Sequence, residues 1–338
     1  MTSLGEVDVA AVGAGIVGCS FAALATRIRP DLTVALVTRN SIFSVTNTQL
    51  SLGVDLPSEL DGRATDLLTD SVRAREILAT VCPSLRGRRQ SAIRVLRRAE
   101  ATSLRMAGQR WEFTPDGDLV TCDSPAVVVH LPEEVVAQLA GWVHVSGSGV
   151  VYENFDVAGW ERAGERIRLT DRGGRELLCR YVFVALGSGL TSSPFAELAP
   201  SGLERRRVAA ARLRIEALQW GGAYLFASAR AALVSGEQPG TFWMRLDGRT
   251  RLAGTDAVPR GFSEADHLEL DRIRVDYLSG VGVDVLEHRA GDDLYAPPAT
   301  PPVVRVRDGI AVSTGCDGTG DGLGPGVARN ALRLLGLA

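Results

Sequence analysis

Two apolar runs near the start of the chain, separated by a helix-like segment, predict the first folding unit. Residues 7–12 and 33–37 are almost entirely apolar, which is typical of strands buried on both faces of a parallel sheet. Residues 16–28 between them carry apolar side chains at the spacing of a helix that packs on such a sheet. The order strand, helix, strand therefore predicts a βαβ unit.

Shorter apolar runs and turn signals alternate along the rest of the chain. Residues 90–130 predict strands of a second sheet, and residues 208–255 are again rich in strand patterns. Between them, residues 145–187 predict a strand, a hairpin that turns at Gly164 and Gly174, and a buried strand. The other expected elements are helices at 62–80, 132–143, 264–279 and 325–337, a proline-rich loop at 291–302 that ends any helix or strand, and a strand at 309–315.

Three glycines directly follow the first predicted strand. Gly13 permits a tight turn, Gly15 lets the backbone approach a pyrophosphate, and Gly18 lets helix and strand pack closely. The N-terminus of the helix then faces the phosphates with its dipole. This favours a dinucleotide site, and the alternative is a turn used only for close packing. The residues expected at the phosphates are Gly13, Ala14, Gly15, Ile16, Val17 and Gly18.

The acidic residue expected after the second strand is absent. It usually stands about 20 residues after the glycine motif and binds the ribose hydroxyls. Here Thr38 stands 20 residues after Gly18, followed by Arg39 and Asn40. Thr38 can hydrogen-bond a ribose, and Arg39 could meet a 2′-phosphate or lie in solvent. We expect these three residues to bind the adenosine part, and FAD, NADP and a weak NAD site all stay open at this point.

Composition excludes several classes of chemistry. All 37 Lys and Arg residues are arginine, so there is no Schiff base to pyridoxal phosphate, no P-loop lysine and no lysine general base. The formal net charge of −3 gives no reason to expect nucleic acid as a partner. Five scattered cysteines and four scattered histidines form no ligand motif, so no metal is expected.

The chain carries no evident membrane or secretion signal. It has no run of 18 apolar residues, so no membrane span is expected. Its first residues, MTSLGEVD, lack the basic start of a signal peptide. We therefore expect a cytoplasmic protein that acts on a small molecule and could form homo- or hetero-oligomers.

Three segments resemble one known family. They are HLPEEVVAQLAG with GVVYENFDVAGWERAGERIRLTDRGGRELLCRYVFVALGSG in residues 130–189, GIAVSTGCDGTGDGLGPGVARNALRLL in residues 309–335, and SVTNTQLSLG in residues 44–53. Taken in their order along the chain, they resemble the FAD-dependent D-amino-acid-oxidase-like (DAO) oxidoreductases, the family of glycine oxidase, sarcosine oxidase and L-2-hydroxyglutarate oxidase. The resemblance covers nearly the whole chain.

The resemblance implies specific contacts with non-covalent FAD. Val157 is implied at the adenine, and Ala185, Leu186 and Gly187 form the turn after the buried strand. The C-terminal glycine-rich turn lies against the flavin, where a helix N-terminus suits the negative charge of the reduced ring. That turn comprises Gly315, Gly318, Thr319, Gly320, Asp321, Gly322 and Leu323, and the residues lining the ring are Ser44, Asn47, Thr48 and Gln49. Cys316 in the turn is expected to be a small packing residue rather than a covalent attachment point.

The resemblance also implies the fold class and the reaction. The fold is α/β, with a Rossmann-like FAD-binding domain of the glutathione-reductase type interleaved with an antiparallel-sheet substrate domain. The FAD-binding domain would comprise residues 1–80, 145–200 and 300–338, and the substrate domain 81–144 and 201–299.

The implied reaction is oxidation of a C–N bond, or with less weight a C–O bond, by hydride transfer to flavin N5. The substrate is a small amine, amino acid or hydroxy acid. This chemistry needs positioning more than a side-chain base. The catalytic candidates are Asn47, Gln49, Tyr295 and Arg245.

Several positions depart from the family pattern. The arginine that clamps a substrate carboxylate is missing from LYAPPATPP, where Tyr295 stands near its place. Arg245 is a replacement candidate, although an exposed arginine is the simpler interpretation. Asp317 and Asp321 stand where the family is mostly neutral. No lysine is present to activate oxygen, so the route of the sarcosine-oxidase branch is closed. The electron acceptor stays open between oxygen, a quinone and a partner protein. Such an altered pocket would suit specialised metabolism.

Three alternatives stay open. Thr38 and Arg39 motivate an NADP-dependent reductase, although a second glycine-rich turn near the C-terminus favours FAD. The unusual aspartates and the missing carboxylate clamp motivate an FAD-binding subunit of a multi-subunit dehydrogenase with little activity alone. A flavin monooxygenase of the hydroxylase type would need a GD-A-x-x stretch, which the C-terminal third lacks.

Overall fold

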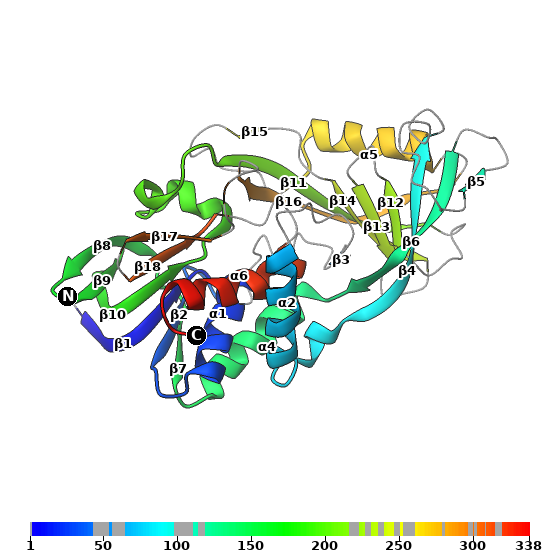
Figure 1. Ribbon diagram of the computed structural model, residues 1–338. Coiled ribbons are helices and arrows are strands. Elements are labelled where there is room, and N and C mark those ends of the chain that lie inside the picture. Colours follow the sequence, from blue (N-terminus) through cyan, green and yellow to red (C-terminus); the bar gives the residue numbers. More distant parts are fainter. Residues whose placement is uncertain are drawn as a thin grey trace.

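The computed structural model consists of two sheets with helices packed on them (Figure 1). The described residues are 2–42, 54–55, 65–97, 111–113, 119–215, 223–226, 231–235, 240–246, 251–252, 261–278, 281–296, 300, 303–307, 309–314 and 320–338.

The first sheet has the order β17-β18-β10-β1-β2-β7, and its central strands are parallel. These are β1 (Thr2–Val12), β2 (Val34–Val37), β7 (Gly149–Tyr152), β10 (Arg175–Val184) and β18 (Ile310–Ser313). Antiparallel strands extend it: β8 (Val157–Ala163), β9 (Arg166–Asp171) and β17 (Val303–Arg307). Every residue of β2 and the last four of β1 are buried, so the predicted buried strands are confirmed.

Apolar layers cover both faces of the first sheet. On one face lie α1 (Ile16–Ile28), α2 (Thr65–Leu78), α4 (Pro132–Val145) and α6 (Gly320–Leu334), as Figure 1 shows. Their apolar side chains share a buried cluster with Val9 and Phe183 of the strands. On the other face, Val12 packs in a cluster with Phe195 between the short helices η4 (Gly187–Ser192) and η5 (Ala196–Leu198). The strands are apolar on both faces because both faces are covered.

The packing of α4 bears on where the two expected domains divide. Leu139 and Ala140 of α4 are fully buried in the same cluster as α1. Trp142 Nε1 also donates a hydrogen bond to Thr26 Oγ1 of α1 at 3.2 Å. The division into domains stays a prediction, and this packing favours a boundary near residue 131 rather than 144.

The second sheet is antiparallel except where β12 pairs with β4. Its strands are β3 (Val54–Asp55), β4 (Arg88–Arg97), β5 (Trp111–Phe113), β6 (Leu119–Val129), β11 (Glu204–Arg214), β12 (Ala223–Phe226), β13 (Ala231–Ser235), β14 (Thr241–Leu246), β15 (Arg251–Leu252) and β16 (Asp284–Tyr295). Helix α5 (Glu264–Tyr277) covers one face, where Leu270 and Ile273 pack on Met244 and Ala211. A capping box of Ser263 and Asp266 begins this helix.

The proline-rich loop expected at 291–302 is partly wrong, because β16 continues through Tyr295. Residues 291–295 pair with β11, opposite residues 204–208. Asp292 also lies 2.7 Å from the guanidinium of Arg205 on β11. The ladder and this ion pair keep the chain in the sheet as far as Tyr295.

The closing helix expected at 325–337 begins five residues earlier, at Gly320, and ends at Leu334. Pro325 therefore lies inside it. Gly324 and Gly326 serve close helix packing rather than a turn. A Cβ on Gly326 would lie 2.5 Å from the backbone oxygen of Leu67 in α2. Gly320, Asp321, Gly322 and Leu323 thus form the first turn of α6.

Candidate functional site

Two glycines at the turn after β1, Gly13 and Gly18, have no room for a side chain. Gly13 has φ of +111°, and a Cβ there would lie 2.4 Å from the backbone oxygen of Ala185. A Cβ on Gly18 would lie 1.8 Å from the oxygen of Gly13. Hydrogen bonds join Gly13 N to Val37 O and Ala185 N to Val12 O, each at 2.8 Å. The ends of β1, β2 and β10 therefore meet at this turn.

The N-terminus of α1 suits an anion. Gly15 is the N-cap residue, makes no side-chain capping hydrogen bond, and is followed by no acidic residue in the first turn. A helix N-terminus with these properties attracts phosphate through its backbone N–H groups and its dipole. Ala14 and Ile16 are buried at 5% and 6% exposure, so the turn presents backbone rather than side chains.

The start of α6 lies beside the start of α1. A Cβ on Gly324 would lie 3.3 Å from Ile16 Cγ2 and 3.5 Å from Val17 Cγ2. Leu323 and Ile16 belong to the same buried cluster. The C-terminal segment implied at the flavin is therefore adjacent to the first glycine turn, although the two are some 300 residues apart in the sequence.

The end of β2 places the three residues expected at the adenosine. Thr38 is half-buried and bonded through its backbone to Tyr152 O at 3.0 Å and Phe155 N at 2.9 Å. Arg39 and Asn40 are exposed. Val157 lies two residues after Phe155, at the start of β8, and packs against the cluster that contains Val12 and Val37.

Sequence reasoning missed an acidic side chain near this strand end. Glu153 follows β7, which pairs with β2 in the register Val37↔Tyr152. Its Oε1 accepts hydrogen bonds from Ser41 Oγ at 2.9 Å and from the backbone N–H of Ile42 at 2.8 Å. Only the strand order, in which β7 lies beside β2, reveals this residue, and the spacing of residues in the sequence does not show that order.

The turn after β10 is also at this junction. Ala185 and Leu186 approach the Cα of Gly13, and Gly187 begins η4 with φ of +54°. Other expected residues lie outside the described residues and stay predictions: Ser44, Asn47, Thr48, Gln49, Gly315, Cys316, Asp317, Gly318 and Thr319. Nothing is described of the side chain of Asp321.

Arg245 and Tyr295 lie on the face of the second sheet opposite α5, here called the open face. Phe242 and Met244 pack under α5, so the alternating residues Trp243 and Arg245 point the other way. The pairing of Tyr295 with Glu204 places it on the same face. The strands thus bring together two residues that are 50 positions apart in the sequence.

Arg245 is not the exposed arginine that seemed the simpler interpretation. Its side chain is 11% exposed and lies 3.4 Å from Asp293 Oδ2. The guanidinium of Arg206 lies 4.5 Å from the ring centroid of Tyr295, and Arg206 also pairs with Glu204 at 3.0 Å. The open face therefore holds ordered, mostly buried charges that could orient a polar substrate.

Three buried cysteines have no role in nucleophilic chemistry. Burial raises the pKa of Cys19 and of Cys179 to about 12, and that of Cys82 to about 11. A thiol with such a pKa is not a thiolate near neutral pH. Among the described residues, no three metal-ligand side chains form a group that could hold an ion.

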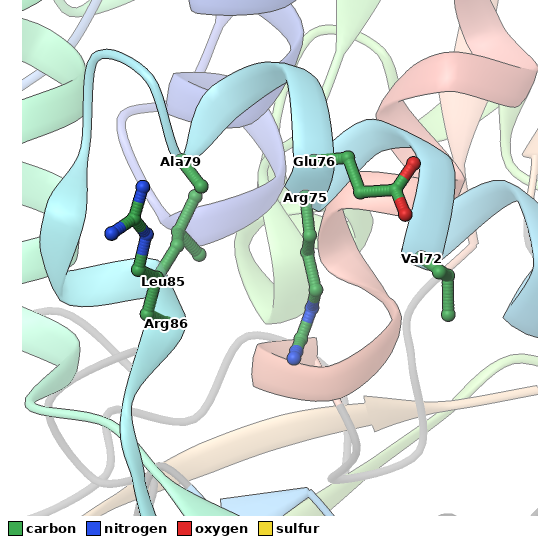
Figure 2. A pocket seen from close by; sticks show the side chains of 6 residues that line it. All are labelled: Val72, Arg75, Glu76, Ala79, Leu85 and Arg86. Atoms are coloured by element: carbon green, nitrogen blue, oxygen red, sulfur yellow. The ribbon is translucent and has the colours of Figure 1, made fainter.

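A shallow hollow of about 440 Å³ lies between α2 and η3 (Pro83–Arg86). Figure 2 shows the side chains of Val72, Arg75, Glu76, Ala79, Leu85 and Arg86 around it. None of the residues expected at the cofactor or the substrate lines this hollow. Arg75 Nη1 donates to His130 Nε2 at 3.3 Å, which ties this surface to the end of β6.

Comparisons with known proteins identify the family to which this glycine junction belongs. The family model of the FAD-dependent oxidoreductases called DAO matches residues 8–334. The chain belongs to this family. It is therefore an FAD-dependent oxidoreductase, and the glycine junction at the ends of β1, β2 and β10 fits the diphosphate of FAD. The expected cofactor, FAD, is thus confirmed, and the alternative of an NADP-dependent reductase is not supported.

Solved structures share the fold at low sequence identity. Glycine oxidase from Geobacillus kaustophilus superposes with a TM-score of 0.76 at 15% identity, over 98% of this chain and 94% of that chain. NikD, an unusual amino acid oxidase essential for nikkomycin biosynthesis, superposes with a TM-score of 0.74 at 14% identity, over 98% of this chain and 94% of that chain. L-proline dehydrogenase from P. horikoshii superposes with a TM-score of 0.70 at 14% identity, over 96% of this chain and 91% of that chain. A search of curated proteins found no match.

The expected α/β architecture is confirmed, with the Rossmann-like part joined to a second, largely antiparallel sheet. In the described part of the chain, no helix is both long and apolar enough to cross a membrane.

Proposed function

We propose that the protein oxidises a C–N bond of a small amine or amino acid, with FAD bound at the glycine junction. The observation that carries this proposal is the convergence of Gly13, Ala185 and the start of α6, joined to a sheet whose open face holds buried charges. Bound FAD supplies the hydride acceptor. The similar structures are named for glycine, amino acid and proline substrates, which supports C–N over C–O oxidation.

In this proposal Arg245 and Tyr295 orient the substrate. Arg245 is held by Asp293 and is largely removed from water, so it would bind an anionic group of the substrate without much reorganisation. Tyr295 is fixed from one side by the guanidinium of Arg206. Asn47 and Gln49 remain the candidates beside the ring, from the family resemblance.

Glu153 is proposed to compensate for the acid missing at Thr38. Its carboxylate bonds Ser41 and Ile42, the residues that follow the expected adenosine contacts. By fixing this segment beside β7, it would keep Thr38 and Asn40 in place for the ribose. Glu153 is thus a positioning residue for the cofactor rather than a catalytic one.

The first test is the visible absorbance spectrum of the purified protein, before and after heat denaturation. Flavin bands that are released into the supernatant on heating are expected, because the cofactor is proposed to be non-covalent. A colourless protein that stays colourless with added FAD would contradict the proposal. Flavin retained on the denatured chain would contradict non-covalent binding and direct attention to Cys316.

The second test is anaerobic bleaching of the flavin by panels of amino acids, amines and hydroxy acids. Bleaching by an amine or amino acid supports the proposal. Bleaching by hydroxy acids alone would replace C–N by C–O chemistry. A bound flavin that no substrate reduces would favour the alternative of an FAD-binding subunit that needs a partner. The electron acceptor is then found by adding oxygen or a quinone to the reduced protein.

A further inference from the structure

The open face carries a second arginine that lies across the centre of the sheet. Arg289 of β16 and Arg245 of β14 both pair with Ala210 of β11, so the two arginines flank the same small residue. The guanidinium of Arg289 crosses β11 and lies 5.3 Å from the ring centroid of Trp243 on β14. Its charge is therefore on the open face beside Trp243 and not at the outer edge of β16.

The strand that Arg289 crosses has short side chains on this face. Val208 and Ala210 are the open-face residues at the centre of β11, and Val208 pairs with Gly291 of β16. Short side chains leave room above a strand for long side chains from the strands on either side. The centre of the open face is thus a shallow floor of small residues with arginines over it.

Arg289 keeps one edge of its guanidinium available for a ligand. Its Nε donates a hydrogen bond to Glu287 Oε1 at 2.6 Å. In the described part of the chain, its two Nη groups donate to no acceptor. Arg206 and Arg245, by contrast, each use an Nη group to bind a carboxylate of the protein. The two Nη groups of a guanidinium form a fork that binds a carboxylate through two parallel hydrogen bonds.

The guanidinium of Arg289 is also held in place before a ligand arrives. Glu287 fixes it at Nε, and the indole of Trp243 lies beside it. Its side chain is 30% exposed, so it is ordered by these two neighbours and still reached from solvent. A cation held in this way loses little conformational entropy when it binds an anion.

Arg245 and Arg289 are held at separate points of the open face. Arg245 is bound by Asp293, and Arg289 by Glu287, six residues earlier on β16. An anionic group at Arg289 therefore lies several bonds away from one at Arg245. A substrate that meets both arginines has two separated anionic groups, which glycine and simple amines lack.

We propose that Arg289 binds a second carboxylate of the substrate, so that the substrate is an acidic amino acid or an amine with two separated carboxylates. Trp243 and Glu287 are positioning residues that hold the guanidinium of Arg289. This inference rests on the proposed function, because it takes the open face as the substrate face, and it names the class of substrate.

Unreactive dicarboxylates test the site without any oxidation. Succinate, glutarate and adipate have no C–N bond to oxidise, and in the monoamide of each a neutral group of similar size replaces one carboxylate. Titration of the oxidised, flavin-loaded protein is followed by the change in flavin absorbance. We expect the best dicarboxylate to bind roughly tenfold or more tightly than its monoamide. Equal affinity for the two, or no binding of any dicarboxylate, overturns the proposal.

Substitution of Arg289 assigns this preference to one side chain. Arg289→Gln is expected to raise the dissociation constant of the dicarboxylate roughly tenfold or more and to leave that of the monoamide nearly unchanged. Arg289→Lys keeps the charge but not the fork, so it should lie between the two. Glu287 still pairs with Arg212 of β11 in both variants, which favours a retained fold.

Arg180→Gln is the matched control for this substitution. Arg180 is an exposed arginine of the first sheet, and its guanidinium also lies over an aromatic ring, 5.6 Å from the centroid of Tyr181. Its loss should leave the affinity for both ligands unchanged. An equal loss in Arg180→Gln and Arg289→Gln, or an Arg289→Gln protein that weakens both ligands alike, contradicts the assignment.

Anaerobic bleaching of the flavin separates this inference from the proposed function. Glutamate is compared with glutamine, and aspartate with asparagine, using both enantiomers of each. We expect the acid of one pair to have the lower KM, and Arg289→Gln to remove that difference while kcat changes less. Amides that bleach the flavin as readily as the acids would overturn the role of Arg289 and leave C–N oxidation standing. Dicarboxylate binding without bleaching by any amine or amino acid would support the carboxylate site and overturn C–N oxidation instead.

Discussion

The two sheets position their functional groups in opposite ways. In the first sheet, both faces are apolar, and the glycine junction is formed by main chain packed closely against main chain, as at Gly13 and Ala185. In the second sheet, one face is apolar under α5, and the open face carries charged side chains such as Arg245 with Asp293. The glycine junction is defined by the absence of side chains, and the proposed substrate face is defined by side chains held in ion pairs.

The sharpest way to break the first arrangement is Gly18→Ala. A Cβ at this position would lie 1.8 Å from the oxygen of Gly13, so the turn must open. We expect a loss on the order of 3 kcal/mol or more in the free energy of unfolding, together with loss of bound flavin. Urea denaturation and the flavin absorbance measure both effects.

Gly141→Ala is the matched control, because nothing lies within 4 Å of a Cβ at that exposed position in α4. It should be neutral or slightly stabilising. A stable, yellow Gly18→Ala protein would show that close packing at the turn is not required.

The second sheet is most sensitive at the ion pair that joins β11 to α5. Arg207 and Asp266 lie 2.6 Å apart, with side chains 8% and 12% exposed. Arg207→Leu leaves a mostly buried carboxylate and is expected to cost about 2–4 kcal/mol in urea unfolding. The control is Arg274→Leu, which breaks an exposed pair on the same helix and should cost less than about 1 kcal/mol.

The same pair predicts a pH dependence. Burial raises the pKa of Asp266, but hydrogen bonds from Arg207 and Ser263 outweigh it and hold the pKa below 3.8. The ionised carboxylate therefore stabilises the fold above pH 3.8, and this contribution is lost as the pH falls through the lowered pKa. The stability gap between wild type and Arg207→Leu should narrow in acid, and a constant gap would argue against this cause.

On the open face, Arg245→Gln tests whether Arg245 binds the substrate or only contributes to packing. We expect kcat/KM to fall about 10- to 100-fold with an anionic substrate, while the flavin spectrum stays unchanged. Asp293→Asn should have a smaller effect, because it only positions the arginine. Arg214→Gln, at an exposed arginine of the neighbouring strand β11, is the control. Equal losses in Arg245→Gln and the control would remove Arg245 from the site.

The smallest expected effect is at Glu153. Glu153→Gln weakens the hydrogen bonds to Ser41 and Ile42, so FAD affinity should fall roughly three- to tenfold with kcat unchanged at saturating FAD. Titration of the FAD-free protein by flavin fluorescence measures it. Glu165→Gln, in the exposed turn between β8 and β9, is the control. An unchanged dissociation constant would leave Glu153 as a surface residue only.

The contrast between the sheets explains what the sequence could predict. Residues 16–28 formed a helix with the expected bounds, because a glycine turn and an apolar face are local signals. Glu153 was missed because its approach to Ser41 depends on β7 lying beside β2. The burial of Arg245 was missed because Asp293 faces it from another strand.

The predicted ends of α6 and β16 were wrong because tertiary packing outweighed the local preferences of glycine and proline. Glycine and proline usually end helices, yet Gly324 and Gly326 let α6 approach α1 and α2. Gly291 and Asp292 resemble a turn, yet pairing with β11 and the ion pair with Arg205 keep them in β16. Ring-lining residues such as Asn47 and Gln49 stay predictions, since they lie outside the described residues.

The meeting of α1 with α6 also constrains when the protein can acquire its cofactor. Gly324 is synthesised some 300 residues after Ile16. The phosphate turn therefore stays incomplete until β18 and α6 have been made, and these contacts of longest range close last. We therefore expect a nascent chain to retain FAD only after α6 has been synthesised.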